Sequence, residues 1–191
     1  MPKLVSTREA LAVLRSAGVG AHAAQRVLAT GLAGEPVRTR SVRLHEEPRV
    51  RELARRPVLP GRTIADHCPR GLFVARRDLP PGLTKEARER RAAAGWGDIS
   101  PWVALRLQLE IERVGPRPFV ACTGGFVTFG AEITQVRAGD GADPSFDLTV
   151  PGPWFGVFEG ARLQTGPGRP WVIHPPTLGA ADPPSRGRIA A

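Results

Sequence analysis

The chain changes character near residue 95, and this change constrains its fold more than any single motif does. Residues 1–95 carry 19 Lys and Arg against 9 Asp and Glu, whereas residues 96–191 carry 8 against 9. The aromatic residues follow the opposite trend, since Phe73 alone of the four Trp and seven Phe precedes residue 96. Two halves with opposite biases indicate two functional units.

The first 57 residues contain start and stop signals that predict a helix, a turn, a second helix, a hairpin and a third helix. Ser6 and Glu9 have the spacing of a capping box, which predicts the start of the first helix. An Ala-rich stretch predicts the second helix, which ends before Gly31 because glycine suits the position after a helix end. Residues 37–44 can form two short strands around a tight turn, and the acidic start at Glu46 predicts the last helix.

This order of residue types resembles the winged helix-turn-helix of MerR-type regulators and phage excisionases. The resemblance is carried in register by Val5-Ser6-Thr7-Arg8-Glu9-Ala10 with Leu14, Gly18-Val19, Arg26, Gly31-Leu32, Pro36, Val37-Arg38, Val42-Arg43-Leu44, Glu46-Glu47, Val50 and Leu53. It implies that the second helix enters the major groove of duplex DNA and that the hairpin lies beside it as a wing. One departure is Gly20, which stands where the family usually has a Ser or Thr cap.

The resemblance and the residue types together give a set of candidate DNA contacts. They are Ser6, Thr7, His22, Gln25, Arg26, Arg38, Arg40, Arg43 and Arg49. Arg26 could fork onto guanine and Gln25 onto adenine, because these pairings match the base edges in the major groove. The three hairpin arginines suit phosphates or an adjacent minor groove, and Ser6 or Thr7 could hold a phosphate at the first helix start. The arginines from Arg49 onward are either phosphate contacts or a solvated helix face, and His45 is expected to be an ordinary wing residue.

The rest of the chain is expected to contain a connector, a β-rich domain and a flexible tail. The connector covers residues 58–98 and includes a charged basic helix, while residues 99–174 contain several short strands separated by Gly and Pro. Frequent turn signals of this kind predict an antiparallel sheet or a barrel, so the whole chain is expected to be α+β. The tail is residues 175–191, which are rich in Pro, Ala and Gly.

The strands of the β-rich domain are expected at clusters of apolar residues. They are 105–112, 119–123, 126–136, 146–150, 154–158, 161–164 and 171–174. Residues 105–112 alternate apolar and polar side chains without a fault, which favours a strand. Ser100-Pro101 before them could equally open a helix.

Enzymatic signals are weak, and the sequence predicts no catalytic residue, no metal site and no cofactor. Asp66-His67-Cys68 brings an acid, an imidazole and a thiol together, but neighbours in sequence do not make a nucleophile–base pair, so an ordinary loop is expected. The acids near residues 110–112 and 140–147 could bind a metal, although a solvated strand face and a polar loop are the favoured interpretations.

These observations predict a cytoplasmic protein with reduced thiols that binds double-stranded DNA with selectivity for sequence or shape. No apolar run is long enough to cross a membrane, so no membrane partner is expected. The expected role is that of a transcriptional or nucleoid-type regulator whose β-rich half forms a homodimer or binds another protein or ligand. Two alternatives remain: the helix-turn-helix docks another protein, or the β-rich half is an enzyme.

Overall fold

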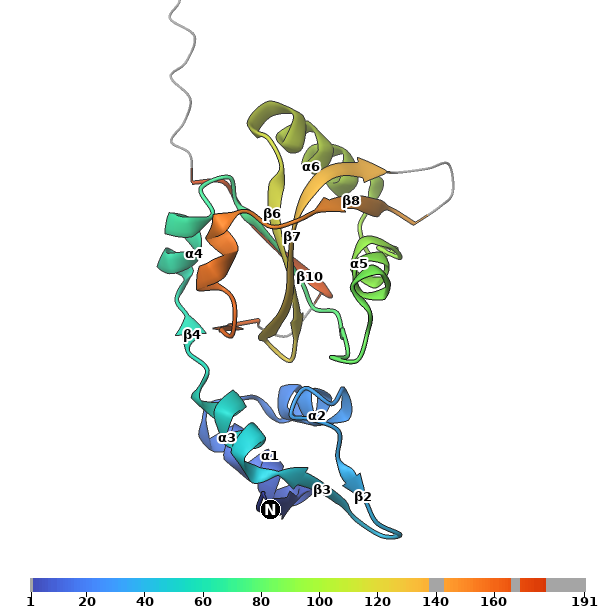
Figure 1. Ribbon diagram of the computed structural model, residues 1–191. Helices are drawn as coiled ribbons and strands as arrows, with labels where there is room; N and C mark the ends of the chain where they lie inside the picture. The colour runs from blue at the N-terminus through green and yellow to red at the C-terminus, as the bar shows by residue number, and fades with distance from the viewer. Residues whose placement is uncertain (1, 138–142, 166–168, 178–191) are drawn as a thin grey trace, which may run out of the picture.

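The computed structural model of the protein describes residues 2–137, 143–165 and 169–177 (Figure 1). Helices and strands occur in both halves of the chain, which confirms the expected α+β class. Three helices and a small sheet lie at one end of the molecule, and a larger sheet with its own helices lies at the other (Figure 1). Residues 178–191 of the expected tail lie outside the described residues, as does Asp140.

The first part of the chain, residues 4–55, is called the N-terminal unit below. Its elements are β1 (Leu4–Ser6), α1 (Thr7–Ser16), α2 (Ala21–Ala29), β2 (Val37–Arg38), β3 (Arg43–Glu46) and α3 (Glu47–Arg55). The strands form an antiparallel sheet in the order β1-β3-β2, so the start of the chain pairs with the hairpin. The sequence predicted the hairpin and the three helices but not the strand β1.

Local signals explain where the helices of this unit begin and end. The capping box is present: the Ser6 hydroxyl accepts from the Glu9 amide, and the Glu9 carboxylate accepts from the Ser6 amide. Gly31 has φ +74°, a left-handed conformation that glycine adopts freely after a helix end. The apolar faces of the three helices meet in one core that includes Leu14, Val27 and Val50. Burial of these faces holds the short helices together, because isolated helices of nine or ten residues are marginal in water.

The remaining described residues, from Val58 onward, form the sheet domain. Its elements are β4 (Val58–Leu59), α4 (Gly61–His67), β5 (Leu72–Ala75), α5 (Lys85–Ala93), α6 (Pro101–Val114), β6 (Arg117–Thr123), β7 (Phe126–Arg137), β8 (Ser145–Thr149), the 3₁₀ helix η1 (Pro153–Val157), β9 (Arg162–Leu163) and β10 (Trp171–His174). The seven strands run in the order β10-β5-β6-β7-β9-β4, with β8 paired to β7 beyond this path. The sheet is mixed, because β5 pairs with β6 and β4 with β9 in parallel.

The second half does contain a multi-stranded sheet, but the expected antiparallel sheet or barrel is a mixed sheet, and the reason lies in residues 58–98. This stretch was expected to be a connector with a possible strand at residues 71–75 and a basic helix at residues 84–94. These two elements are β5 and α5, and together with β4 and α4 they belong to the sheet domain. All four residues of β5 are buried, so β5 is a central strand. The link from β5 to β6 contains α5 and α6, and a connection of that length allows two neighbouring strands to run parallel.

Two further expectations for the second half are corrected by the structure. Residues 105–112 are helical and belong to α6, because the Ser100 hydroxyl caps the helix by accepting from the Val103 amide and Pro101 occupies its first turn. Residues 154–158 were expected to be a strand, but 153–157 form the 3₁₀ helix η1. Pro153 starts η1, since proline fits the first turn of a helix.

The N-terminal unit and the sheet domain share a packed junction at α2. Figure 1 shows α2 beside the turn that links β6 and β7. Phe126 at the start of β7 is fully buried in the core of the N-terminal unit. At Gly124, which has φ +57°, a Cβ atom would lie 2.6 Å from the carbonyl oxygen of Ala23. Only glycine allows the turn to approach the helix backbone this closely.

Candidate nucleic-acid interface

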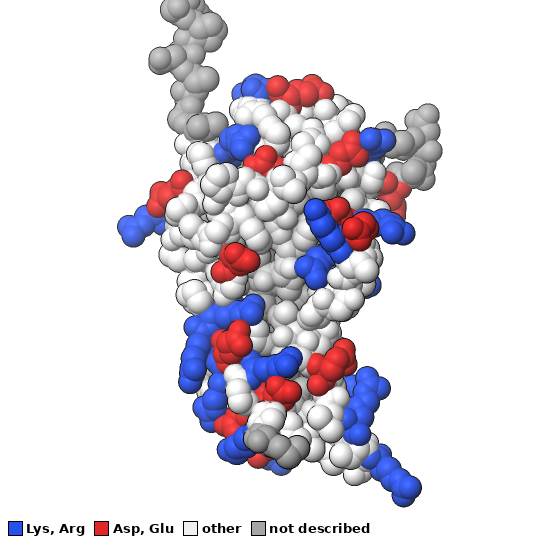
Figure 2. Space-filling model, in the orientation of Figure 1, with Lys and Arg blue, Asp and Glu red and all other residues white. Residues whose placement is uncertain are grey.

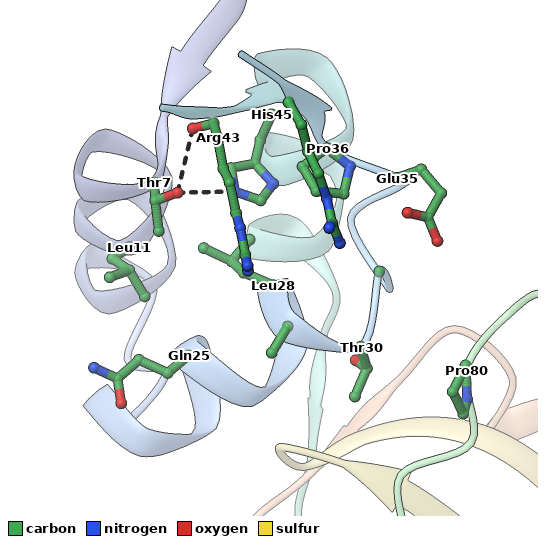
Figure 3. A pocket seen from close by; sticks show the side chains of 13 residues that line it. Thr7, Leu11, Gln25, Leu28, Thr30, Glu35, Pro36, Arg43, His45 and Pro80 are labelled. Atoms are coloured by element: carbon green, nitrogen blue, oxygen red, sulfur yellow. Dashed lines mark hydrogen bonds between the residues drawn. The ribbon is translucent and has the colours of Figure 1, made fainter. Parts of the chain in front are cut away.

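A pocket of about 370 Å³ opens between α1, α2 and the β2–β3 hairpin (Figure 3). Its lining residues come from these elements, the loop after α2 and one residue of the sheet domain: Thr7, Leu11, Gln25, Leu28, Ala29, Thr30, Gly31, Glu35, Pro36, Arg38, Arg43, His45 and Pro80. Four of the candidate DNA contacts, namely Thr7, Gln25, Arg38 and Arg43, therefore meet around one concave site. We call this site the hairpin pocket.

The β3 side of the hairpin pocket is organised by a hydrogen-bonded chain (Figure 3). The Thr7 hydroxyl oxygen lies 3.3 Å from the Arg43 carbonyl oxygen and 3.2 Å from Nε2 of His45. A hydroxyl has one proton, so when Thr7 donates it to the carbonyl, His45 donates from Nε2 to Thr7. The Arg43 side chain extends from β3 toward α2, which places its guanidinium over the pocket (Figure 3).

His45 is a buried residue and not the ordinary wing residue that the sequence predicted. Only 3% of its surface is exposed, and Nδ1 has no hydrogen-bond partner among the described residues. Burial lowers the pKa of His45, and the positive charge of Arg43 lowers it further. The ring is therefore neutral at neutral pH, and the positive charge of the pocket comes from Arg38 and Arg43. The sequence offered no strong signal for this burial, because a lone histidine in a four-residue strand fits either face.

Two further candidate contacts, Ser6 at the end of β1 and Arg49 on α3, have partners within the N-terminal unit. Ser6 is engaged in the capping box, and its hydroxyl also lies 2.8 Å from the Glu9 carboxylate. These hydrogen bonds lower the pKa of Glu9, which keeps a negative charge at the start of α1 and disfavours a phosphate there. Arg49 forms an ion pair of 2.6 Å with Glu46. Arg40 lies in the exposed turn of the hairpin, outside the pocket.

The candidate contacts on α2 divide between two sites. Gln25 faces the hairpin pocket, whereas His22 and Arg26 line a second pocket of about 340 Å³ beside the β6–β7 turn. Nη2 of Arg26 lies 3.0 Å from Oδ1 of Asp78, and Nε lies 3.3 Å from Oδ2. Arg26 thus connects α2 to the sheet domain. The sequence could not reveal this pairing, because Asp78 lies in a different domain.

Positive charge on the sheet domain is largely used in internal contacts. Arg77 donates to the carbonyl oxygens of Arg91, Ala94 and Gly95 at the end of α5, and its guanidinium lies 4.1 Å from the Trp96 ring centre. Figure 2 shows blue side chains gathered on the N-terminal unit, while the visible face of the sheet domain is mostly white. The hairpin arginines are therefore the more accessible part of the basic excess.

The residues that suggested other chemistry lie apart from these pockets. Cys68 and Cys122 are buried and free, and burial raises the pKa of each thiol to about 12, so neither is a thiolate near neutral pH. Across residues 2–137, 143–165 and 169–177, no cluster of His, Cys, Asp and Glu could hold a metal ion. Within the same ranges, no helix has the length and apolar character needed to cross a bilayer.

No family model matches the chain, and neither the curated proteins nor the solved structures contain a match.

Proposed function

We propose that the N-terminal unit is a winged helix-turn-helix that binds double-stranded DNA, and that the protein acts as a transcriptional or nucleoid-type regulator in the cytoplasm. The observation that supports this proposal most strongly is the convergence of Thr7, Gln25, Arg38 and Arg43 on the hairpin pocket. These side chains come from α1, α2 and both strands of the hairpin, the elements that contact DNA in winged proteins.

Each side chain has a defined role in this proposal. Arg38 and Arg43 hold backbone phosphates, since most protein–DNA hydrogen bonds are made to the backbone and fix the register of the protein. The Thr7 hydroxyl, through its hydrogen bonds to β3, positions the strand that carries Arg43. Gln25 reads an adenine edge in the major groove, and Arg40 at the hairpin turn reaches an adjacent groove. Arg26 is assigned to the junction with Asp78 and not to a guanine.

One observation favours a second candidate function, in which α2 serves as a packing module. The β6–β7 turn approaches the Ala23 carbonyl closely, and Arg26 is paired to the sheet domain. These contacts use part of α2 for packing, while Gln25 and Ala29 face the hairpin pocket. A packing module would need no nucleic acid, so the two functions differ in whether the full-length protein binds a duplex.

Salt-dependent duplex binding tests the proposal. We expect the affinity of the full-length protein to fall linearly on logarithmic axes as salt increases, because phosphate contacts release counterions. Replacing both Arg38 and Arg43 with alanine removes two phosphate contacts and should make the slope shallower by about 1.8. Fluorescence anisotropy with a labelled duplex measures both quantities.

A matched variant with Arg62→Ala and Arg90→Ala loses the same charge from exposed positions outside the hairpin pocket. Its salt dependence should have the slope of the wild type, apart from the small change that the lower net charge causes. If the two double variants lost the same amount of duplex affinity and slope, the hairpin pocket would not be the DNA-binding site. Absence of binding to any duplex at low salt would overturn DNA binding and favour the packing module.

A further inference from the structure

The helix α6 has apolar side chains on two opposite faces. Its inner face buries Ala104, Leu107 and Ile111 against the sheet. Its outer face exposes a second apolar set, in which Trp102 is 80%, Leu105 49% and Leu109 55% exposed. We call these three residues the outer stripe.

The outer stripe follows from the alternating pattern of residues 105–112. Residues two apart differ by about 200° around an α-helix, so an apolar residue at every second position fills both faces. Trp102, Leu105 and Leu109 are spaced i, i+3 and i+7, and they therefore form one continuous row. The sheet accounts for the inner face alone, because one row of apolar residues suffices to pack a helix on a sheet.

The outer stripe differs from other exposed apolar residues of the described chain. Val58 and Val150, for example, lie singly on separate segments, which is normal for a protein surface. Monomeric proteins rarely expose a contiguous apolar row that contains a tryptophan. Patches of this kind commonly mark binding surfaces. One Trp side chain alone can bury about 150–250 Å².

The charged residues beside the outer stripe can form ion pairs between two copies of α6. At 100° per residue, Arg106 and Arg113 lie on one side of the row and Glu112 lies on the other. Arg106 is already paired with Glu110 at 3.2 Å within the helix, whereas Arg113 is exposed. When two copies of α6 lie side by side and parallel, Arg113 of each copy faces Glu112 of the other. In an antiparallel pair the arginine sides face each other, which is unfavourable.

We propose that the outer stripe is a homodimer interface in which α6 packs parallel against α6 of a second copy. Trp102, Leu105 and Leu109 form its apolar centre, and the two Glu112–Arg113 pairs fix its direction. Standard interfaces bury about 800 Å² per partner and depend most on such central aromatic residues. Figure 1 shows α6 at the end of the molecule away from α1, α2 and α3, so this contact leaves the hairpin pocket open.

Sedimentation equilibrium of the full-length protein, without DNA, tests the interface directly. We expect a reversible dimer for the wild type and a dissociation constant at least about 100-fold higher for Trp102→Ser with Leu109→Ser. Val150→Ser, at a site that is 72% exposed, is the matched control and should leave the dimer unchanged. Circular dichroism shows whether each variant keeps its helix content. A wild type that stays monomeric, or a control that dissociates equally, overturns the interface.

The direction of the helices is tested by charge exchange. Glu112→Arg alone should raise the dissociation constant about tenfold, because Arg113 of the partner then faces an arginine. Adding Arg113→Glu to the same chain should restore dimerisation. Failure of the second substitution to restore it would exclude the parallel arrangement. Neither measurement involves duplex binding, so the dimer and the DNA-binding proposal can fail independently.

Discussion

Burial gives the two arginines and the histidine of the hairpin pocket different roles. Arg38 and Arg43 are exposed and always positively charged, so their guanidinium groups can bind a phosphate directly from solvent. His45 is enclosed and neutral, and its hydrogen bond to Thr7 holds β3 against α1. The histidine therefore supports the pocket from beneath, while the arginines provide its attraction for anions.

His45 also makes stability depend on pH. Its pKa in the folded state is lowered, so below about pH 6.5 the unfolded state binds a proton that the folded state resists. The stability is fully present above pH 6.5 and decreases as the pH falls toward the folded-state pKa. His174, whose pKa burial also lowers, contributes in the same direction.

We expect His45→Gln to reduce the loss of stability between pH 7.5 and pH 5, because glutamine keeps a donor for Thr7 but does not titrate. Urea unfolding at the two pH values measures the loss. His22→Gln replaces an exposed histidine and serves as the control, which should lose as much stability as the wild type. If the His45 variant lost as much stability between the two pH values as the wild type, protonation of His45 would not be what destabilises the folded state.

At the scale of elements, the sequence predicted those whose signals are local. The capping box at Ser6, the glycine after α2 and the strand at 171–174 all agree with the structure. The first two depend on a few adjacent residues and one backbone preference, whereas the strand also needs β5, with which it pairs.

The elements that the sequence misjudged depend on contacts between distant segments. In α6 the helix start at Ser100 outweighs the alternating pattern. The inner residues of the helix pack against the sheet, and the outer residues stay exposed. A strand was possible at residues 71–75 from the sequence, but its central place could not be predicted, because that place depends on β6 and β10 pairing with β5 on both sides. Likewise, the sequence named Thr7, Gln25 and Arg43 as DNA contacts, which remains a prediction, but it could not reveal the Arg26–Asp78 pair between distant segments.

The junction between α2 and the β6–β7 turn gives a prediction at this scale. Gly124→Ala should destabilise the protein by about 2 kcal/mol or more, because it combines left-handed backbone strain with a methyl group 2.6 Å from the Ala23 carbonyl oxygen. Urea unfolding measures the change. Gly82→Ala, which meets no atom within 4 Å, is the control and should change stability by less than about 0.5 kcal/mol. Equal effects at the two sites would mean that the junction is loose.

At the scale of the whole molecule, the two proposed surfaces lie toward opposite ends. The hairpin pocket belongs to the N-terminal unit, and α6 lies at the far end of the sheet domain (Figure 1). The α6 contact leaves both hairpin pockets open, so a dimer formed through it carries two N-terminal units that are free to bind DNA. Each unit then has its own duplex-binding surface, so the dimer can hold two duplexes at once.

We expect the wild type to bridge duplexes, so that an immobilised duplex retains a second, labelled duplex in proportion to the protein added. Trp102→Ser with Leu109→Ser should still bind a single duplex but should retain little of the second one, since each monomer has one N-terminal unit. The Arg38→Ala and Arg43→Ala variant should lose both signals together. Bridging that survives in a protein shown to be monomeric by sedimentation would place a second DNA site within one chain and would separate bridging from the α6 contact.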